Sequence, residues 1–90
     1  MAWSLEYSDE ARRNLDKLDA QTARRIVVFL GGRVASLDDP RSIGEALKGP
    51  RLDAFWKYRV GDYRIIVEIF DARLLIHVVR IGNRKDVYRK

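Results

Sequence analysis

The order of apolar and polar residues predicts a strand followed by two helices before Pro40. Apolar residues at positions 3, 5 and 7 alternate with polar residues at 4 and 6, the period-two pattern of a half-buried strand. Ser8 then offers an N-cap to a helix with acidic residues at 9 and 10 and apolar residues at 11, 15 and 18. Asp19 is a cap for a second helix, which ends by Asp39 because a residue before proline avoids helical geometry. We expect an antiparallel helical hairpin, with close packing or a bend at Gly31-Gly32.

The second half of the chain predicts three strands. Residues 55–60, 63–70 and 74–81 are rich in β-branched and aromatic side chains. Gly61-Asp62 has the length of a tight hairpin turn, and residues 71–73 separate the next two strands. Residues 40–53 are predicted to be a loop, with a short turn around 43–47. The order β-α-α-β-β-β indicates one α+β domain over residues 1–90, with both helices on one face of a small, mainly antiparallel sheet.

Alternation along the strands predicts which side chains face the helices. The predicted sheet core comprises Trp56, Tyr58, Ile65, Val67, Ile69, Leu75 and Val79. The single histidine, His77, is also expected on this side.

The opposite face of the sheet is predicted to be basic. If Gly61-Asp62 is the hairpin turn, Arg59 lies directly opposite Arg64, and Lys57 is on the same face. A three-residue loop at 71–73 would place Arg80 beside Arg64. Like charges across a strand pair are destabilising, and a bound polyanion would relieve that cost. The alternative is a solvated face whose cations discourage edge pairing.

Charge supports the polyanion interpretation. The net charge is +5, residues 48–64 carry +3 and residues 80–90 carry +4, so the rest of the chain carries −2. Basic patches of this kind are typical of nucleic-acid partners. Further basic residues of the two segments are predicted to bind RNA: Lys48, Arg51, Arg80, Lys85 and Arg89. In the segment after residue 81, Arg84 and Tyr88 extend the set, with Tyr88 either stacking on a base or anchoring the tail.

The composition excludes several kinds of site and location for this protein. With no cysteine and one histidine, disulfides, Cys-based metal sites and His-rich zinc sites are excluded, and we expect no cofactor and no metal. No apolar run is long enough for a membrane span and the N-terminus does not resemble a secretion signal, so we expect a cytoplasmic protein without a membrane partner.

Three stretches together resemble the RelE/ParE superfamily of toxins from toxin–antitoxin pairs. They are Leu47-Lys48-Gly49, residues 56–66 with the core Arg-Val-Gly-Asp-Tyr-Arg, and residues 81–89 with the ending Gly-x-Arg-x-x-Val-Tyr. The resemblance implies a RelE-like fold over essentially the whole chain. It also implies an RNA-cleaving toxin, in which the 2′-hydroxyl of mRNA in the ribosomal A site attacks the adjacent phosphate.

The resemblance also implies roles for individual residues. Lys57 and Arg59 match a basic pair that activates the 2′-hydroxyl and holds the phosphate, and Arg64 matches an arginine that stabilises the scissile phosphate. Arg84 matches the arginine assigned to protonating the leaving oxygen, although an always-charged guanidinium acts mainly electrostatically. Tyr88 matches a tyrosine that stacks on or orients the substrate.

Two departures and one alternative accompany this resemblance. Asn83 stands where many relatives have histidine, and the basic pair contains one lysine rather than two. The ParE-like branch has the same fold, inhibits DNA gyrase and does not cleave RNA. The partners implied by the resemblance are the ribosome, mRNA and a cognate, RelB-like antitoxin, expected to cover the basic face or displace the tail around Tyr88.

Overall fold

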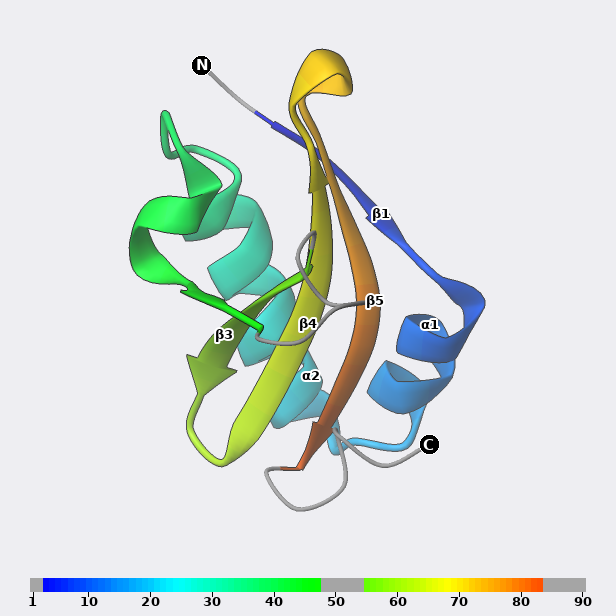
Figure 1. Ribbon diagram of the computed structural model, residues 1–90. Helices are drawn as coiled ribbons and strands as arrows, with labels where there is room; N and C mark the ends of the chain where they lie inside the picture. Colours follow the sequence, from blue (N-terminus) through cyan, green and yellow to red (C-terminus); the bar gives the residue numbers. More distant parts are fainter. Residues whose placement is uncertain (1–2, 48–54, 84–90) are drawn as a thin grey trace.

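The computed structural model describes residues 3–47 and 55–83, which fold into a mixed five-stranded sheet with both α-helices on one side (Figure 1). In chain order the elements are β1 (Ser4–Tyr7), α1 (Asp9–Asp16), α2 (Ala20–Val28), the π-helix η1 (Phe29–Val34), the 3-10 helix η2 (Pro40–Ile43), β2 (Glu45–Ala46), β3 (Phe55–Val60), β4 (Tyr63–Phe70), the 3-10 helix η3 (Asp71–Arg73) and β5 (Leu75–Asn83). The expected α+β arrangement is therefore confirmed. No helix in the described part of the chain is long and apolar enough to cross a bilayer.

The strands lie in the order β1-β5-β4-β3-β2. The meander of β3, β4 and β5 is antiparallel, as predicted, and β2 adds an antiparallel edge strand. At the other edge, β1 runs parallel to β5, with Ser4 opposite Leu75 and Tyr7 opposite Val78. Within the described residues no other strand pairs with β5 beyond that point, and its edge there lies beside α1, where Ile81 N donates to Asn14 Oδ1 (2.9 Å).

Both predicted helix caps are present. The Ser8 hydroxyl accepts a hydrogen bond from Ala11 N (2.9 Å) and donates to the Val79 carbonyl (2.7 Å), so it joins α1 to β5. Asp19 accepts hydrogen bonds from the hydroxyl and the backbone N–H of Thr22, which hold the pKa of Asp19 below its usual value. Side-chain caps of this kind satisfy backbone donors that the first turn leaves unpaired.

The expected irregularity at Gly31-Gly32 takes the form of a π-helix. Ala35 N donates to the Leu30 carbonyl five residues earlier (2.9 Å). Leu30 and Val34 remain fully buried on the sheet side of this wider turn. A Cβ on Gly31 would lie 3.9 Å from Leu5, whereas one on Gly32 would meet open space. A Cβ at Gly31 would make only an ordinary contact with β1, and Gly32 lies on an unobstructed surface, so the bend rather than close packing is the feature found here.

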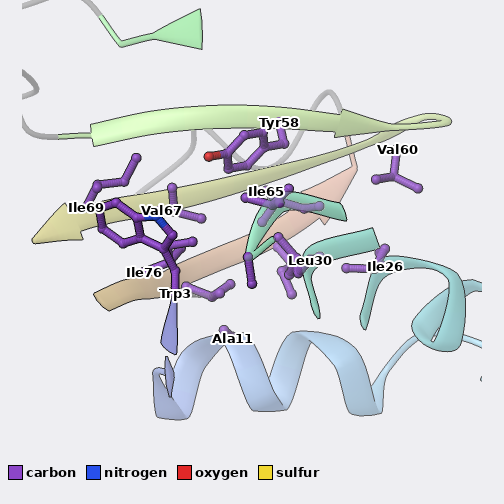
Figure 2. Packing of buried hydrophobic residues seen from close by; sticks show 14 residues of the cluster. Trp3, Ala11, Ile26, Leu30, Tyr58, Val60, Ile65, Val67, Ile69 and Ile76 are labelled. Carbon is purple, nitrogen blue, oxygen red and sulfur yellow. The ribbon is translucent and has the colours of Figure 1, made fainter. Parts of the chain in front are cut away.

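The core lies between the sheet and the helices. Figure 2 shows Tyr58, Ile65, Val67 and other strand residues pointing toward Ala11 of α1, and toward Ile26 and Leu30. Four predicted core positions are confirmed as members of this cluster, Tyr58, Ile65, Val67 and Ile69, and Trp56 packs against it partly buried.

The prediction for β5 was wrong by one residue. Ile76, Val78 and Ile81 enter the core cluster, while Leu75 and His77 alternate onto the opposite face and Val79 is only partly buried. The loop after β4 has four residues, since Leu74 adopts the left-handed conformation (φ 47°) and Phe70 pairs with Leu75. A pairing irregularity at Ile66/Val67 then shifts the register again. Leucine is rare in left-handed backbone, so the residue pattern did not indicate this loop.

The segment predicted as a loop contains η2 and the short strand β2. Gly44 permits this course, because a Cβ there would lie 2.9 Å from the Tyr58 ring and 3.2 Å from the Lys57 carbonyl. The buried Tyr58 hydroxyl donates to the Pro40 carbonyl (2.6 Å), and burial raises the pKa of Tyr58 to about 12. These contacts fix η2 against β3.

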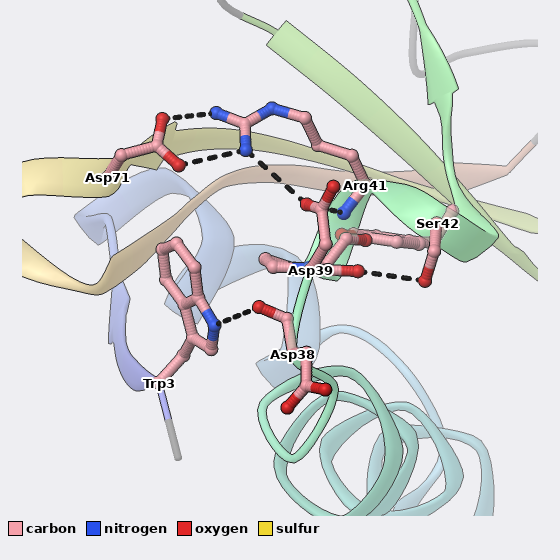
Figure 3. A network of polar contacts seen from close by, with 8 residues as sticks. Trp3, Asp38, Asp39, Arg41, Ser42 and Asp71 are labelled. Atoms are coloured by element: carbon pink, nitrogen blue, oxygen red, sulfur yellow. Dashed lines mark hydrogen bonds and ion pairs between the residues drawn. The ribbon is translucent and has the colours of Figure 1, made fainter. Parts of the chain in front are cut away.

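Arg41 joins η2 to the turn at η3 (Figure 3). Its guanidinium donates to both Asp71 carboxylate oxygens, at 3.0 and 2.6 Å, and contacts Asp39 at 3.4 Å. The hydrogen bonds and charge of Arg41 hold the pKa of Asp71 below its usual value. Nearby, Trp3 Nε1 donates to the Asp38 carbonyl at 3.4 Å. These contacts hold the segment that follows the helices against the β4–β5 turn and the start of β1.

Ser8→Ala is expected to destabilise the protein by about 1–2 kcal/mol, because the helix cap is lost and the Val79 carbonyl loses a donor. Chemical denaturation would measure this. Ser36→Ala is the matched control, since the exposed Ser36 hydroxyl bonds only to carbonyls of its own helical turn in the described residues. Equal effects of the two substitutions would contradict the bridging role of Ser8.

Asp71→Asn is expected to lower the melting temperature at pH 7 but not below the folded pKa of Asp71. Because that pKa is lowered, the stabilisation is present above the unfolded value of about 4 and is lost as the pH falls through the folded value. Thermal melts of wild type and variant from pH 7 to pH 2 would measure the difference. Asp38→Asn is the control, and a pH-independent deficit for Asp71→Asn would refute the ion-pair account.

Candidate RNA interface

A basic cluster lies on the sheet face opposite the helices. As predicted, Val60 pairs with Tyr63 across the two-residue turn, and Arg59 lies directly opposite Arg64. Pairs that flank such a turn exchange hydrogen bonds, so the next pair is of the closer, non-hydrogen-bonded kind, with Cα atoms about 4.5 Å apart. Two guanidinium groups therefore leave neighbouring strands side by side.

Lys57 and Arg80 occupy the adjacent row of the same face. Both lie opposite Ile66 of β4, from its two sides. Arg80 was predicted beside Arg64, and this was wrong, because Gly82 occupies that position. The longer loop and the register shift together displace β5 by two residues, an even number that keeps Arg80 on the predicted face. Ile66, 7% exposed, gives the row an apolar centre.

The Arg80 side chain is engaged at the sheet edge. Its Nε lies 2.8 Å from a Glu10 carboxylate oxygen in the first turn of α1. Arg80 thus contributes charge to the rim of the cluster while its guanidinium is held toward the helix. Of the four cations predicted together, Lys57, Arg59 and Arg64 are the three most closely grouped by strand pairing.

Within the group of Lys57, Arg59 and Arg64, Arg64 has a buried donor atom. Its Nη1 is buried and has no hydrogen-bond partner among the described residues. A buried donor without a partner costs free energy, and the cost is larger beside a second cation. A phosphate oxygen would satisfy this donor, because guanidinium groups bind phosphate in a bidentate manner.

Glu45 is a neighbour that the sequence interpretation missed. It lies directly opposite Lys57, on β2, and is exposed. The two residues place opposite charges directly across the β2–β3 pair, an arrangement that is favourable in a sheet. Residues 40–53 showed no strand pattern, so only the short pairing of β2 reveals this contact.

A third row of side chains on this face gives it a charge gradient. His77 lies between Glu6 of β1 and Glu68 of β4, two residues further along the strands from the Lys57 row. Acidic side chains thus lie toward one end of the face and the arginine pair toward the β3–β4 turn. A polyanion is favoured at the arginine end alone.

Several predicted site residues lie outside the described residues. They are Lys48, Arg51, Arg84, Lys85, Tyr88 and Arg89. Among residues 3–47 and 55–83, no group of three His, Cys, Asp or Glu side chains is arranged to hold a metal ion.

The proteins of known family that this chain is similar to are all described as toxins. The family described as ParE toxin of type II toxin-antitoxin system, parDE, matches residues 5–88. Toxin RelG of Mycobacterium tuberculosis is 28% identical over 90 residues, the full length of both chains. Toxin RelE of the same organism is 30% identical over 79 residues, covering 88% of this chain and 78% of that protein.

Solved structures show the same fold. A chain of the RelBE2 toxin-antitoxin complex of M. tuberculosis superposes with a TM-score of 0.84 at 26% identity, covering 96% of this chain and 95% of that one. A chain of the archaeal RelE-RelB complex from Pyrococcus horikoshii superposes with a TM-score of 0.75 at 22% identity, covering 97% and 100%.

Proposed function

This chain belongs to the ParE toxin family of type II toxin-antitoxin systems, within the RelE/ParE superfamily. We propose that it is a metal-independent endoribonuclease of the cytoplasm, which cleaves mRNA in the ribosomal A site. The observation that carries the proposal is the pairing of Arg59 with Arg64 beside Lys57 on one sheet face. Clustered cations stabilise the added negative charge of a pentavalent phosphate without a metal ion.

The proposed reaction is an internal transfer. The 2′-oxygen forms a bond to phosphorus while the bond from phosphorus to the 5′-oxygen breaks, which leaves a 2′,3′-cyclic phosphate and a 5′-hydroxyl. Lys57 or its neighbour Glu45 accepts the 2′-hydroxyl proton, and Arg64 and Arg59 hold the phosphate oxygens. Arg84 stabilises the leaving 5′-oxygen, which takes its proton from water, and Tyr88 stacks on the substrate.

An antitoxin is the expected protein partner, because the similar solved structures include toxin–antitoxin complexes. A RelB-like acidic segment that covers the basic face would block RNA. The complex is then expected to bind RNA much more weakly than the free toxin.

A second candidate function is inhibition of DNA gyrase. It is favoured by the description of the matching family, which is that of the ParE toxins. The Lys57, Arg59 and Arg64 cluster would be dispensable for that activity, so the two functions differ in their dependence on this face.

A cell-free translation reaction with purified toxin tests the proposal. Primer extension on the mRNA is expected to show discrete new ends within codons, and these ends should disappear when ribosomes are omitted. Cuts that persist without ribosomes would identify a free ribonuclease. Intact mRNA and normal translation would refute the nuclease proposal, and a gyrase supercoiling assay would then test the alternative.

A further inference from the structure

A β-bulge in β5 lies directly before Arg80. Ile66 of β4 pairs with Arg80, and the next residue, Val67, pairs with Val78, so Val79 is an extra residue on β5. A bulge bends its strand and re-aims the side chains beside it. Arg80 therefore leaves β5 next to this bend, on the sheet face that carries the cations.

The start of α1 holds this bulge in place. The Ser8 hydroxyl donates to the Val79 carbonyl (2.7 Å), and Ser8 N donates to the Val78 carbonyl (2.9 Å). Two residues further along the chain, Glu10 Oε2 lies 2.8 Å from Arg80 Nε. The helical turn that fixes the bulge therefore also supplies the carboxylate that pairs with Arg80.

This ion pair divides the basic face into two parts. On the β5 side, the charge of Arg80 is matched by that of Glu10. At the β3–β4 hairpin, Arg59 and Arg64 lie opposite each other, and the salt bridges found among the described residues include neither of them. An anion is drawn to cations whose charge is not already offset, which favours the hairpin pair.

Without Glu10, Arg80 could bind the same RNA strand. Arg80 lies opposite Ile66, two residues along β4 from Arg64 and on the same face. The rows of Arg64 and Arg80 are thus about 7 Å apart along the strands, a distance that one extended RNA strand bridges. A phosphate bound at Arg80 would shift the RNA relative to the hairpin.

Other carboxylates disfavour phosphate on the same side of the face. Glu68 lies two residues along β4 from Ile66, and Glu6 lies across His77 from Glu68. Together with Glu10, they place negative charge away from the β3–β4 turn. Specific recognition often depends on such elements, which disfavour the wrong position of a ligand.

We propose that Glu10 is a positioning residue that withholds Arg80 from RNA, so that the phosphate binds at Arg59 and Arg64. The inference rests on the proposed function and deepens it, because it assigns the residue that selects between two phosphate positions. It requires that the chain binds RNA on this face, and it does not require that the RNA is cleaved.

Fluorescence anisotropy with a labelled, 2′-O-methylated single-stranded RNA, which cannot be cleaved by attack of its 2′-oxygen, tests the inference. Glu10→Gln removes the charge and keeps the size of the side chain. It is expected to strengthen RNA binding about tenfold, the contribution of one charged hydrogen bond. The slope of log affinity against log salt concentration should steepen by about 0.7, the value for one added phosphate contact on a single strand.

Asp9→Asn is the matched control. Asp9 is an exposed carboxylate in the same first turn of α1, so this substitution changes the net charge equally. It should leave the salt slope unchanged, because it releases no arginine. An equal gain in affinity for Asp9→Asn and Glu10→Gln would overturn the inference.

Arg80→Gln separates the release of Arg80 from a general effect of charge. In this background Glu10→Gln should give no gain in affinity, because the side chain that it releases is absent. Glu10→Ala, a second way to remove the carboxylate, should give the same gain as Glu10→Gln when Arg80 is present. A gain of equal size with and without Arg80 would overturn the inference.

Thermal melts exclude a merely structural role. Glu10 and Arg80 are 44% and 31% exposed, and exposed ion pairs contribute little to stability, so Glu10→Gln should melt close to wild type. Unchanged or weaker RNA binding by this folded variant would refute the proposed role of Glu10. If RNA binding depends on Glu10 as expected but ribosome-bound mRNA stays intact, the nuclease proposal fails and this inference stands. Cleavage of mRNA with no effect of Glu10→Gln on RNA binding would show the reverse.

Discussion

Arg64→Ala is expected to lose RNA cleavage by about 10²–10³-fold while the protein stays folded. Arg64 presents a buried Nη1 without a partner among the described residues, and it lies opposite Arg59. Removal of one donor from a charge-stabilising site typically costs this much in rate. Removal of one of two paired like charges also relieves repulsion, so the melting temperature should be unchanged or higher.

Single-turnover cleavage of ribosome-bound mRNA, together with a thermal melt, would measure both effects. Arg13→Ala is the matched control, since Arg13 is an exposed arginine of α1, on the helix side of the sheet. A variant that cleaves at the wild-type rate would remove Arg64 from the site. A variant that is unfolded would instead give Arg64 a structural role.

Ile76→Ala is expected to have the largest effect on stability, a loss of about 2–5 kcal/mol. Ile76 is fully buried in β5, opposite Ile69 of β4 and Leu5 of β1. Truncation leaves a cavity at the junction of three strands. At roughly 4–8 °C per kcal/mol for a domain of this size, the melting temperature should fall by at least about 10 °C.

His77→Ala is the control for that experiment. The next residue along β5 points to the opposite face and is only partly buried, so its truncation should cost much less. Denaturant unfolding of both variants compares the two faces directly. A larger loss for His77→Ala than for Ile76→Ala would contradict the observed register of β5.

Local chemistry explains which parts of the fold were predictable. Ser8 and Asp19 predict where the helices start, because few other side chains cap a helix well. Gly61, at a φ of +59°, forms the turn that places Arg59 opposite Arg64. These features depend on a few neighbouring residues. The positions of Lys57, Arg59 and Arg64 were therefore predictable, because the β3–β4 hairpin alone places them.

The remaining features depend on contacts between distant segments. Leu74 adopts a left-handed conformation that usually requires glycine or asparagine. The sequence-based prediction therefore made the loop too short and misplaced Arg80 and His77. The pairing of Glu45 with Lys57 depends on Gly44 packing against Tyr58. Neither is visible in the periodicity of apolar residues.

The pairing of β1 with β5 has a consequence for folding kinetics. Residues 4–7 complete the sheet only with residues 75–78, so the loop that must close spans most of the chain. Such long-range pairing slows folding, because chain entropy is lost before the contacts form. During synthesis the first strand has no partner until β5 has left the ribosome. The sheet therefore cannot be completed before residues 75–78 have left the ribosome, and a partner present at that moment meets a sheet that has just formed.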